Sequence, residues 1–406
     1  MVSPPSSGVS FSDQVRSAAA RLGFDAVGIA RASEAIDGDF ARYEAFIAAG
    51  MHGEMGWLAA HEGVRARLDG EGILPGAKSV VCVARRYQRP VPGPEQEVGQ
   101  EKGYLRDPLI HGIARYARGR DYHRFLRRRV RRLASFLRSL GTPEAPVRAR
   151  PLCDDAPVLE RAWAVRAGLG FVGKNGMLIV PGLGSMVLLG EVVTTLDLGG
   201  DPSPDPSSDV PGRRSPERQR LRMPMEERCG ACTRCIDACP TDAFARPFVL
   251  DPRRCVSYLT IEHRGAIPAE LREGIGTHIF GCDECQTVCP FNAGAGARAA
   301  IDTRDGDPFA PLERWSRVRL ESLLLLDEPS WLALFEGTPL RRVGRAGIAR
   351  NAAIALGNRG DESALPALRE AAAGHDHPLV REAASWAVSR IERGDYSACA
   401  VPLAAT

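Results

Sequence analysis

Lysine is nearly absent from this chain. Lys78, Lys102 and Lys174 are the only lysines among 53 basic Lys and Arg residues, so arginine carries the positive charge. The net charge is only +3, but residues 115–138 hold ten arginines and one aspartate, and residues 341–350 hold four more arginines. A guanidinium group matches phosphate geometry, so both segments favour phosphate contacts. A biased genomic base composition would produce the same excess.

Long apolar runs are also missing. No stretch reaches the ~20 apolar residues that a bilayer-spanning helix needs. The first residues, MVSPPSSGVSFSDQVRS, lack the basic and apolar regions of a secretory signal. These features predict a cytoplasmic protein with no membrane partner. The 406 residues, 44% of them hydrophobic and 25% charged, are enough for two or three domains with buried cores. No heptad seam or large apolar face is evident, so we expect a monomer.

Cysteine, in contrast, is abundant and clustered. Eight of the eleven cysteines fall within residues 229–289, a span of 61 residues. In a reducing compartment such clustering indicates metal binding rather than disulfides. Cys82, Cys153 and Cys399 stand apart from this segment, and we interpret them as ordinary small apolar residues.

The spacing of the clustered cysteines is typical of iron–sulfur proteins. The stretch CGACTRCIDACP at 229–240 follows the C-x2-C-x2-C-x3-C-P run, in which the fourth cysteine serves the other cluster of a two-cluster ferredoxin. A lone cysteine at 255 and the stretch GCDECQTVCP at 281–290 complete the set, a departure from a simple ferredoxin. Structural zinc, with two C-x2-C pairs per ion, is the alternative. The pattern predicts one 4Fe–4S cluster on Cys229, Cys232, Cys235 and Cys289, and a second on Cys239, Cys255, Cys282 and Cys285.

The remaining chain divides into three further segments. Residues 11–198 alternate helical and strand-like stretches, which predicts an α/β domain whose first helix has Ser12 as N-cap and Gly23 just past its end. Residues 199–220 are rich in Pro, Ser and Asp and are predicted to be a flexible insertion before a cluster-binding domain at 221–300. Residues 315–395 carry Arg- and Ala-rich amphipathic helices in a partial repeat. This resembles a short all-α array of HEAT-like repeats.

One glycine-rich stretch precedes the cysteines. GLGFVGKNG at 168–176 lies between a predicted helix and a strand, and its glycines would allow a ligand to approach the backbone closely. It lacks the Gly-Lys-Ser/Thr ending of a P-loop and has the wrong element order for a dinucleotide fingerprint. A plain turn is the alternative. Just upstream, Asp154 would serve either as a functional carboxylate or as the N-cap of a helix over 157–167.

Several segments together resemble one family. DDAPVLERAWAVRAGLGFVGKNG at 154–176, the double-cluster cysteines, RRCVSYLTIEHRGAIP at 253–268 and the helical tail are similar to epoxyqueuosine reductases. The resemblance covers roughly residues 11–395. It implies an enzyme that depends on cobalamin and two 4Fe–4S clusters, acts on tRNA carrying epoxyqueuosine, and completes queuosine biosynthesis. Asp155 departs from the family's usual Ser or Thr at that position.

The resemblance also implies roles for particular residues. Asp154 would donate a proton to the leaving epoxide oxygen, and burial near the corrin would raise its pKa. The N-terminal α/β domain would bind cobalamin, and the implied cofactor contacts are Asp154, Arg67, Tyr116, Gly173, Lys174, Asn175, Ser257 and Tyr258. His123 is interpreted as a histidine satisfied within the protein, not as a cobalt ligand. The arginines proposed to contact tRNA are Arg341, Arg342, Arg345 and Arg350.

Two other functions remain open from the sequence. One is a cobalamin and iron–sulfur reductase of a small molecule, of the reductive-dehalogenase kind, which would not need a basic helical tail. The other is an electron carrier with interaction repeats, which would leave the segments around Asp154 and Lys174 unexplained. The electron donor is not identified by any motif.

Overall fold

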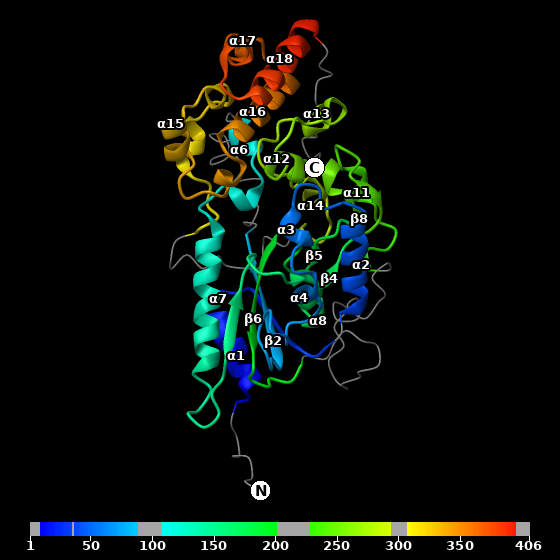
Figure 1. Ribbon diagram of the computed structural model, residues 1–406, viewed down its shortest axis with the longest axis vertical. Helices are drawn as coiled ribbons and strands as arrows, with labels where there is room; N and C mark the ends of the chain where they lie inside the picture. The colour runs from blue at the N-terminus through cyan, green and yellow to red at the C-terminus, as the bar shows by residue number, and fades with distance from the viewer. Residues whose placement is uncertain (1–8, 35, 88–107, 201–227, 294–306, 395–406) are drawn as a thin grey trace.

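The computed structural model describes residues 9–34, 36–87, 108–200, 228–293 and 307–394. Figure 1 shows an elongated molecule with an α/β unit at one end, helical repeats at the other, and the cysteine-rich segment beside their junction. The predicted insertion at 199–220 lies outside the described residues from 201 onward, as does Cys399. Among the described helices, none is both long enough and apolar enough to cross a membrane.

The α/β unit is built on a fully antiparallel sheet. Its strands lie in the order β1-β2-β6-β3, so every neighbour in space runs in the opposite direction. Alternating helices and strands in sequence therefore do not produce a parallel sheet here. The central pair, β2 and β6, is in register over eight residues and is rich in the β-branched valines that suit strands. The strand bounds are β1 (Ala26–Arg31), β2 (Ser79–Arg86), β3 (Ala149–Leu152) and β6 (Val187–Thr194).

Each face of the sheet is covered by helices. On one face, α1 (Phe11–Arg21) and α7 (Tyr122–Arg138) enclose a core with Ile29, Val81 and Val83. On the other, α8 (Glu160–Arg166) packs Trp163 against the sheet. Cys82 and Cys153 are buried in these two cores. The smaller elements are α2 (Asp37–Ala48), α3 (Gly56–Ala59), α4 (Glu62–Ala66), α6 (Pro108–His111), η1 (Arg115–Ala117), β4 (Phe171–Val172) and β5 (Leu178–Ile179).

Two local expectations for these helices are corrected. The N-cap of α1 is Ser10, whose Oγ accepts from Asp13 N (3.1 Å), whereas Ser12 lies in the first turn and donates to the Leu198 carbonyl. In α7 the apolar side chains face the core as expected, but not every arginine lies outside. Arg129 is buried, because its guanidinium stacks over the Phe125 ring (3.5 Å to the centroid).

The cysteine-rich segment and the helical repeats share one hydrophobic core, which continues from Leu259 and Phe280 into Leu323, Phe335 and Ile354. Small residues permit close helix contacts: a side chain at Gly357 of α16 would collide with α18. The segment contains α11 (Arg234–Asp237), β7 (Phe244–Arg246), β8 (Val249–Leu250), η2 (Pro252–Arg254), α12 (Val256–Ile261), α13 (Ala269–Ile275) and α14 (Glu284–Thr287). The repeats contain η3 (Glu313–Arg317), η4 (Leu320–Leu324), α15 (Glu328–Leu334), η5 (Pro339–Val343), α16 (Arg345–Arg359), η6 (Glu362–Ala364), α17 (Leu365–Gly374) and α18 (Pro378–Arg393).

A buried guanidinium joins these two parts. Arg350 of α16 is 1% exposed and donates to the carbonyls of Leu259 (2.9 Å), His263 (2.9 Å) and Gly265 (2.6 Å) at the end of α12. The neighbouring Asn351 amide donates to the Thr260 and Ile279 carbonyls. Buried carbonyls that lose their donors cost free energy, so these bonds fix how the repeats dock.

We predict that Arg350→Met destabilises the protein, because it leaves three buried carbonyls without donors. The expected loss is about 3 kcal/mol, a drop of roughly 5–10 °C in the thermal unfolding midpoint followed by circular dichroism. Arg341→Met is the matched control, since Arg341 is exposed and has no side-chain partner among the described residues. An Arg350→Met protein as stable as the control would contradict this account of the junction.

Candidate functional site

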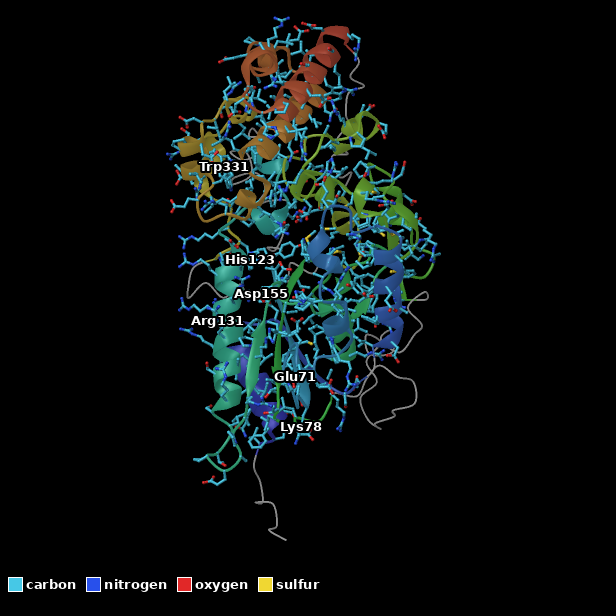
Figure 2. All side chains as sticks on the ribbon, in the orientation of Figure 1. Glu71, Lys78, His123, Arg131, Asp155 and Trp331 are labelled. Atoms are coloured by element: carbon cyan, nitrogen blue, oxygen red, sulfur yellow. The ribbon has the colours of Figure 1, made fainter. Side chains whose placement is uncertain are left out.

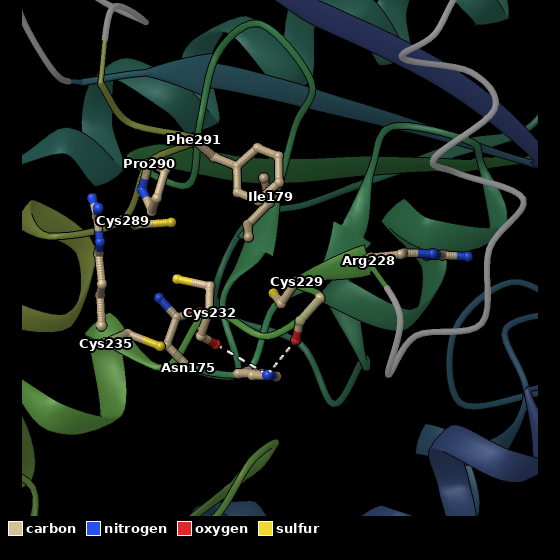
Figure 3. A pocket seen from close by; sticks show the side chains of 12 residues that line it. Asn175, Ile179, Arg228, Cys229, Cys232, Cys235, Cys289, Pro290 and Phe291 are labelled. Atoms are coloured by element: carbon tan, nitrogen blue, oxygen red, sulfur yellow. Dashed lines mark hydrogen bonds between the residues drawn. The ribbon is translucent and has the colours of Figure 1, made fainter.

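Four cysteines line one cavity of about 300 Å³. Figure 3 shows Cys229, Cys232, Cys235 and Cys289 arranged around it, with Ile179 and Phe291 forming an apolar part of its wall. Among the described residues, no three His, Cys, Asp or Glu side chains stand close enough to hold a single metal ion. Thiols spread around a cavity suit a polynuclear cluster that is held at its corners.

Electrostatic coupling links the thiols within each predicted set and also between the two sets. Burial, and then the negative charges of Cys289 and Cys229, raise the pKa of Cys235 to about 11. Burial also raises the pKa of Cys289, whose charged neighbours are Cys229 and Cys232. Several thiolates in one buried place are unfavourable without a counter-charge, and iron would supply it.

The second set is built in the same way. Burial raises the pKa of Cys282, with Cys255 and Cys285 as its charged neighbours. Burial likewise raises the pKa of Cys285, which is coupled to Cys255, Cys235 and Cys239. Cys239 also accepts a hydrogen bond from Ala243 N (3.3 Å). Cys239 thus lies near the second set, but Cys235 is coupled to Cys285 as well, so the assignment of each cysteine to one cluster stays a prediction.

The glycine-rich loop serves the cluster side. Lys174 Nζ donates to the carbonyls of Gly230 (2.7 Å) and Cys232 (3.0 Å), and Asn175 Nδ2 donates to that of Cys285 (3.3 Å). Gly173 packs against Ile179, where a side chain would collide. Lys174 and Asn175 thus contact the cysteine-bearing loops, and the expected cobalamin contacts of these three residues stay predictions.

Asp154 is held in place by the first turn of α7. It follows β3 with a positive φ of 55°, and its Oδ2 accepts from the Tyr122 hydroxyl (2.8 Å) and lies 3.3 Å from His123 Nε2. His123 Nδ1 in turn lies 2.7 Å from Asp121 Oδ1. Figure 2 labels His123 and Asp155 at the end of α7 that faces the repeats. A non-glycine residue in the left-handed region is uncommon and often marks a functional site.

The pKa of Asp154 is lowered, whereas a raised pKa is expected from the sequence. Burial alone would raise the pKa of Asp154, but hydrogen bonds from His123 and Tyr122, and the charges of His123 and Arg342, hold it below its usual range. Hydrogen bonds to Asp121 and Asp154 raise the pKa of His123 to about 9. At neutral pH the proton therefore resides on His123 and Asp154 is ionised. The predicted raised pKa of Asp154 is wrong for this state of the protein.

The alternative role of Asp154 as a helix cap is also wrong. Helix α8 begins at Glu160, and its N-cap is Leu159, so Asp154 stands outside that helix. Instead, Glu160 Oε1 accepts from Asp154 N (3.0 Å), and burial raises the pKa of Glu160 to about 7. The substituted Asp155 pairs with Arg127 (3.4 Å).

Four other implied cofactor contacts lie in different surroundings. Tyr116 is half-buried and packs edge-on against Tyr122 (5.7 Å between centroids), and the charge of Asp154 contributes to its raised pKa after burial and Asp283. Ser257 Oγ accepts from Cys282 N (3.0 Å). Tyr258 instead bridges to the N-terminal unit, because its hydroxyl accepts from Glu54 N (2.9 Å). Arg67, with 74% of its side chain exposed, pairs with Asp69.

The four expected tRNA-contacting arginines differ in burial and in their partners. Arg350 is buried, so its expected contact with tRNA is corrected to a structural role. Arg345 pairs with Glu328 and Asp376 within the repeats, and its contact with tRNA stays a prediction. Arg341 is exposed and has no side-chain partner among the described residues. The charge of Arg342 contributes to the lowered pKa of Asp154, after the hydrogen bonds from His123 and Tyr122.

Sequence reasoning missed the partners of Asp154. Tyr122 and His123 lie some thirty residues upstream in an arginine-rich helix, where the basic residues dominated the interpretation. The motif Asp121-Tyr122-His123 at a helix start was the available signal, since Asp is a preferred N-cap. Nothing in the sequence indicated that Arg342 would approach Asp154.

Comparisons with known families cover all three parts of the chain. Residues 67–155 match the family model described as epoxyqueuosine reductase QueG, DUF1730. Residues 228–292 match a 4Fe-4S double cluster binding domain, and residues 344–403 match HEAT repeats. The iron–sulfur segment and the HEAT-like repeats predicted from the sequence are thereby confirmed.

Individual relatives agree over nearly the whole chain. The chain is 39% identical to the epoxyqueuosine reductase of Pseudomonas aeruginosa, covering 91% of each protein, and 36% identical to that of Escherichia coli, covering 94% of this chain and 89% of the relative. A crystal structure of epoxyqueuosine reductase with an epoxyqueuosine-modified stem loop of tyrosine tRNA has a TM-score of 0.73 and 30% identity, and covers 93% of this chain and 89% of that one. The chain belongs to the epoxyqueuosine reductase family and is an oxidoreductase.

Proposed function

We propose that the protein reduces the epoxide of epoxyqueuosine in tRNA to the alkene of queuosine. In the balanced reaction the epoxide takes up two electrons and two protons, both C–O bonds break, one C=C bond forms, and the oxygen leaves as water. The observation that carries the proposal is the Asp154 carboxylate, half-exposed between the α/β unit and the repeats and bonded to the protonated His123. The solved relative with a modified tRNA stem loop supports the substrate.

The two thiol sets would hold 4Fe–4S clusters, which transfer electrons one at a time. A low-potential cobalt centre is what cobalamin would supply when bound. Val187 and Leu189, at the start of central strand β6, are half-exposed apolar side chains on one face of the sheet, and a large ligand there would cover them. Tyr116 and Ser257 stand toward the second thiol set, and we assign them to the cofactor side.

Protons would reach the substrate from the side of α7. Asp154 is the group that meets the epoxide oxygen, and His123, 3.3 Å away, is the proton source that recharges it. Asp121 keeps His123 protonated at neutral pH by accepting from Nδ1. The surroundings thus lower the pKa of Asp154 and raise the pKa of His123, and such a separation of pKa values between neighbours is typical of acid–base pairs.

The phosphates of tRNA would lie along α7. Arg124, Arg128, Arg131 and Arg132 are exposed, and none of them makes an ion pair with a described residue. Their spacing of four, three and one places them on one face of the helix, opposite its buried leucines. Arg131, labelled in Figure 2, belongs to this stripe, which begins one residue beyond His123. Unneutralised arginines on one face favour a polyanion.

The first prediction concerns Asp154. Asp154→Asn should retain both clusters and cobalamin but lose turnover by at least ~100-fold, because an amide cannot deliver the proton. The measurement is mass analysis of nucleosides after anaerobic incubation with epoxyqueuosine tRNA, in which turnover removes one oxygen. Full activity of the variant would remove Asp154 as the donor. No reduction by fully loaded wild type would favour the small-molecule reductase.

The second prediction concerns pH. With a His123 pKa of about 9, kcat of the wild type should be level through neutral pH and fall above about pH 9. His123→Gln should lower kcat by about 100-fold and abolish that fall, because no proton is then lost there. Asp121→Asn removes a partner that raises the pKa of His123, so the fall should move to lower pH. Identical pH profiles for all three proteins would exclude His123 as the proton source.

The third prediction concerns the arginine stripe. Arg128→Glu combined with Arg131→Glu should weaken tRNA binding about 10-fold or more, and should lower the slope of log affinity against log salt by about 1 per arginine. Arg21→Glu combined with Arg246→Glu makes the same change in net charge at exposed positions elsewhere. Equal effects of the two double variants would show that only net charge matters.

A further inference from the structure

Trp57 is exposed beside Arg342. Its side chain is 53% exposed, the largest exposed aromatic group among the described residues, whereas Trp163, Trp315 and Trp331 are buried. The guanidinium of Arg342 lies 6.0 Å from the centre of its ring, and Arg342 is the residue whose charge reaches Asp154. An exposed aromatic ring held against an arginine needs a reason, because burial of the ring would be favourable.

The backbone beneath Trp57 is held firmly. Arg65, itself 4% exposed, donates from Nη2 to the Trp57 carbonyl (3.1 Å) and stacks over the Tyr43 ring. The Tyr43 hydroxyl donates to the carbonyl of Leu58 (2.7 Å). The short helix α3 is therefore anchored from both α2 and α4, and the indole is presented to solvent from a fixed support.

Arg342 is fixed as well. Its Nε donates to Glu262 Oε1 (2.6 Å), and its backbone carbonyl accepts from Arg264 Nη2 (3.0 Å). Arg264 N in turn donates to Glu54 Oε2 (2.5 Å), three residues before Trp57. The ring and the guanidinium are thus brought together from the N-terminal unit and the repeats through the cysteine-rich segment. The terminal nitrogens of Arg342 have no hydrogen-bond partner among the described residues and remain free to donate.

We propose that Trp57 and Arg342 form a platform on which an unpaired nucleotide next to the modified one stacks. The indole would take the face of the base, and Arg342 would bind the adjoining phosphate, which leaves the modified base free to turn toward Asp154. Unpaired bases in RNA loops are recognised by stacking on aromatic rings and guanidinium planes. The inference rests on the proposed function and specifies the part of the substrate that this surface reads.

The test is a double-mutant cycle on RNA-binding affinity, in which one change is made in the protein and the other in the RNA. Trp57→Ala should weaken binding of a modified anticodon stem loop to the loaded enzyme about 10-fold, whereas Trp57→Phe, which keeps an aromatic face, should stay close to wild type. An abasic nucleotide on one side of the modified base should weaken wild-type binding by a similar factor. Trp57→Ala should then add no further loss with that abasic RNA. Phe11→Ala, which truncates another exposed aromatic residue, should have no effect.

Two results would overturn the platform. One is wild-type affinity in Trp57→Ala. The other is a loss of affinity in Trp57→Ala that is independent of the abasic nucleotide, whichever side of the modified base that nucleotide occupies. Trp57 would then not act by stacking on either neighbouring base. Either result, with wild type still reducing the stem loop, leaves the proposed function standing. Failure of wild type to bind or reduce the stem loop would instead reject the proposed function and the platform with it.

Discussion

The geometry of the site depends on the buried guanidinium of Arg350. It ties α16 to the backbone at the end of α12, and the same stretch of chain carries Glu262 and Arg264, which position Arg342. These polar groups lie at the edge of an otherwise apolar core, so a shifted docking would leave donors and acceptors unpaired. The repeats are therefore more than an appended binding module, because their docking fixes the position of Arg342.

A second constraint acts on Asp154 itself. Its burial favours a neutral acid, but Tyr122 and His123 stabilise the carboxylate, and Glu160 is raised to a pKa of about 7 beside it. A raised pKa would keep the proton on Asp154 before substrate arrives. The observed arrangement instead keeps the proton one hydrogen bond away on His123, from which it can move when negative charge develops on the substrate oxygen. The proposed proton donor is thereby the hydrogen-bonded pair of Asp154 and His123 rather than a single protonated carboxyl.

The sequence was informative where chemistry is local. Cysteine spacing predicted the double-cluster segment, because cluster ligation requires short fixed intervals, and the repeats were visible in their small-residue periodicity. The sequence did not reveal contacts between residues far apart in the chain. Lys174, in a loop predicted to contact a cofactor, donates to carbonyls 56 and 58 residues away. Arg350 looked like a surface arginine, and only the packing of α16 shows it to be internal.

The distribution of charge accounts for how a polyanion could offer one base to this site. The interior near Asp154 disfavours charge: burial raises the pKa of Glu191 well above its usual value, so this carboxyl is uncharged at neutral pH, and both of its oxygens lack hydrogen-bond partners among the described residues. A phosphate group moved into this interior would lose its hydration without gaining a partner, whereas an uncharged base would not meet that cost. Outside, the arginine stripe of α7 and Arg342 would attract phosphate under the proposed function. Together these two conditions would hold the backbone at the rim and let the base enter, so the depth of entry would depend on charge as well as on shape.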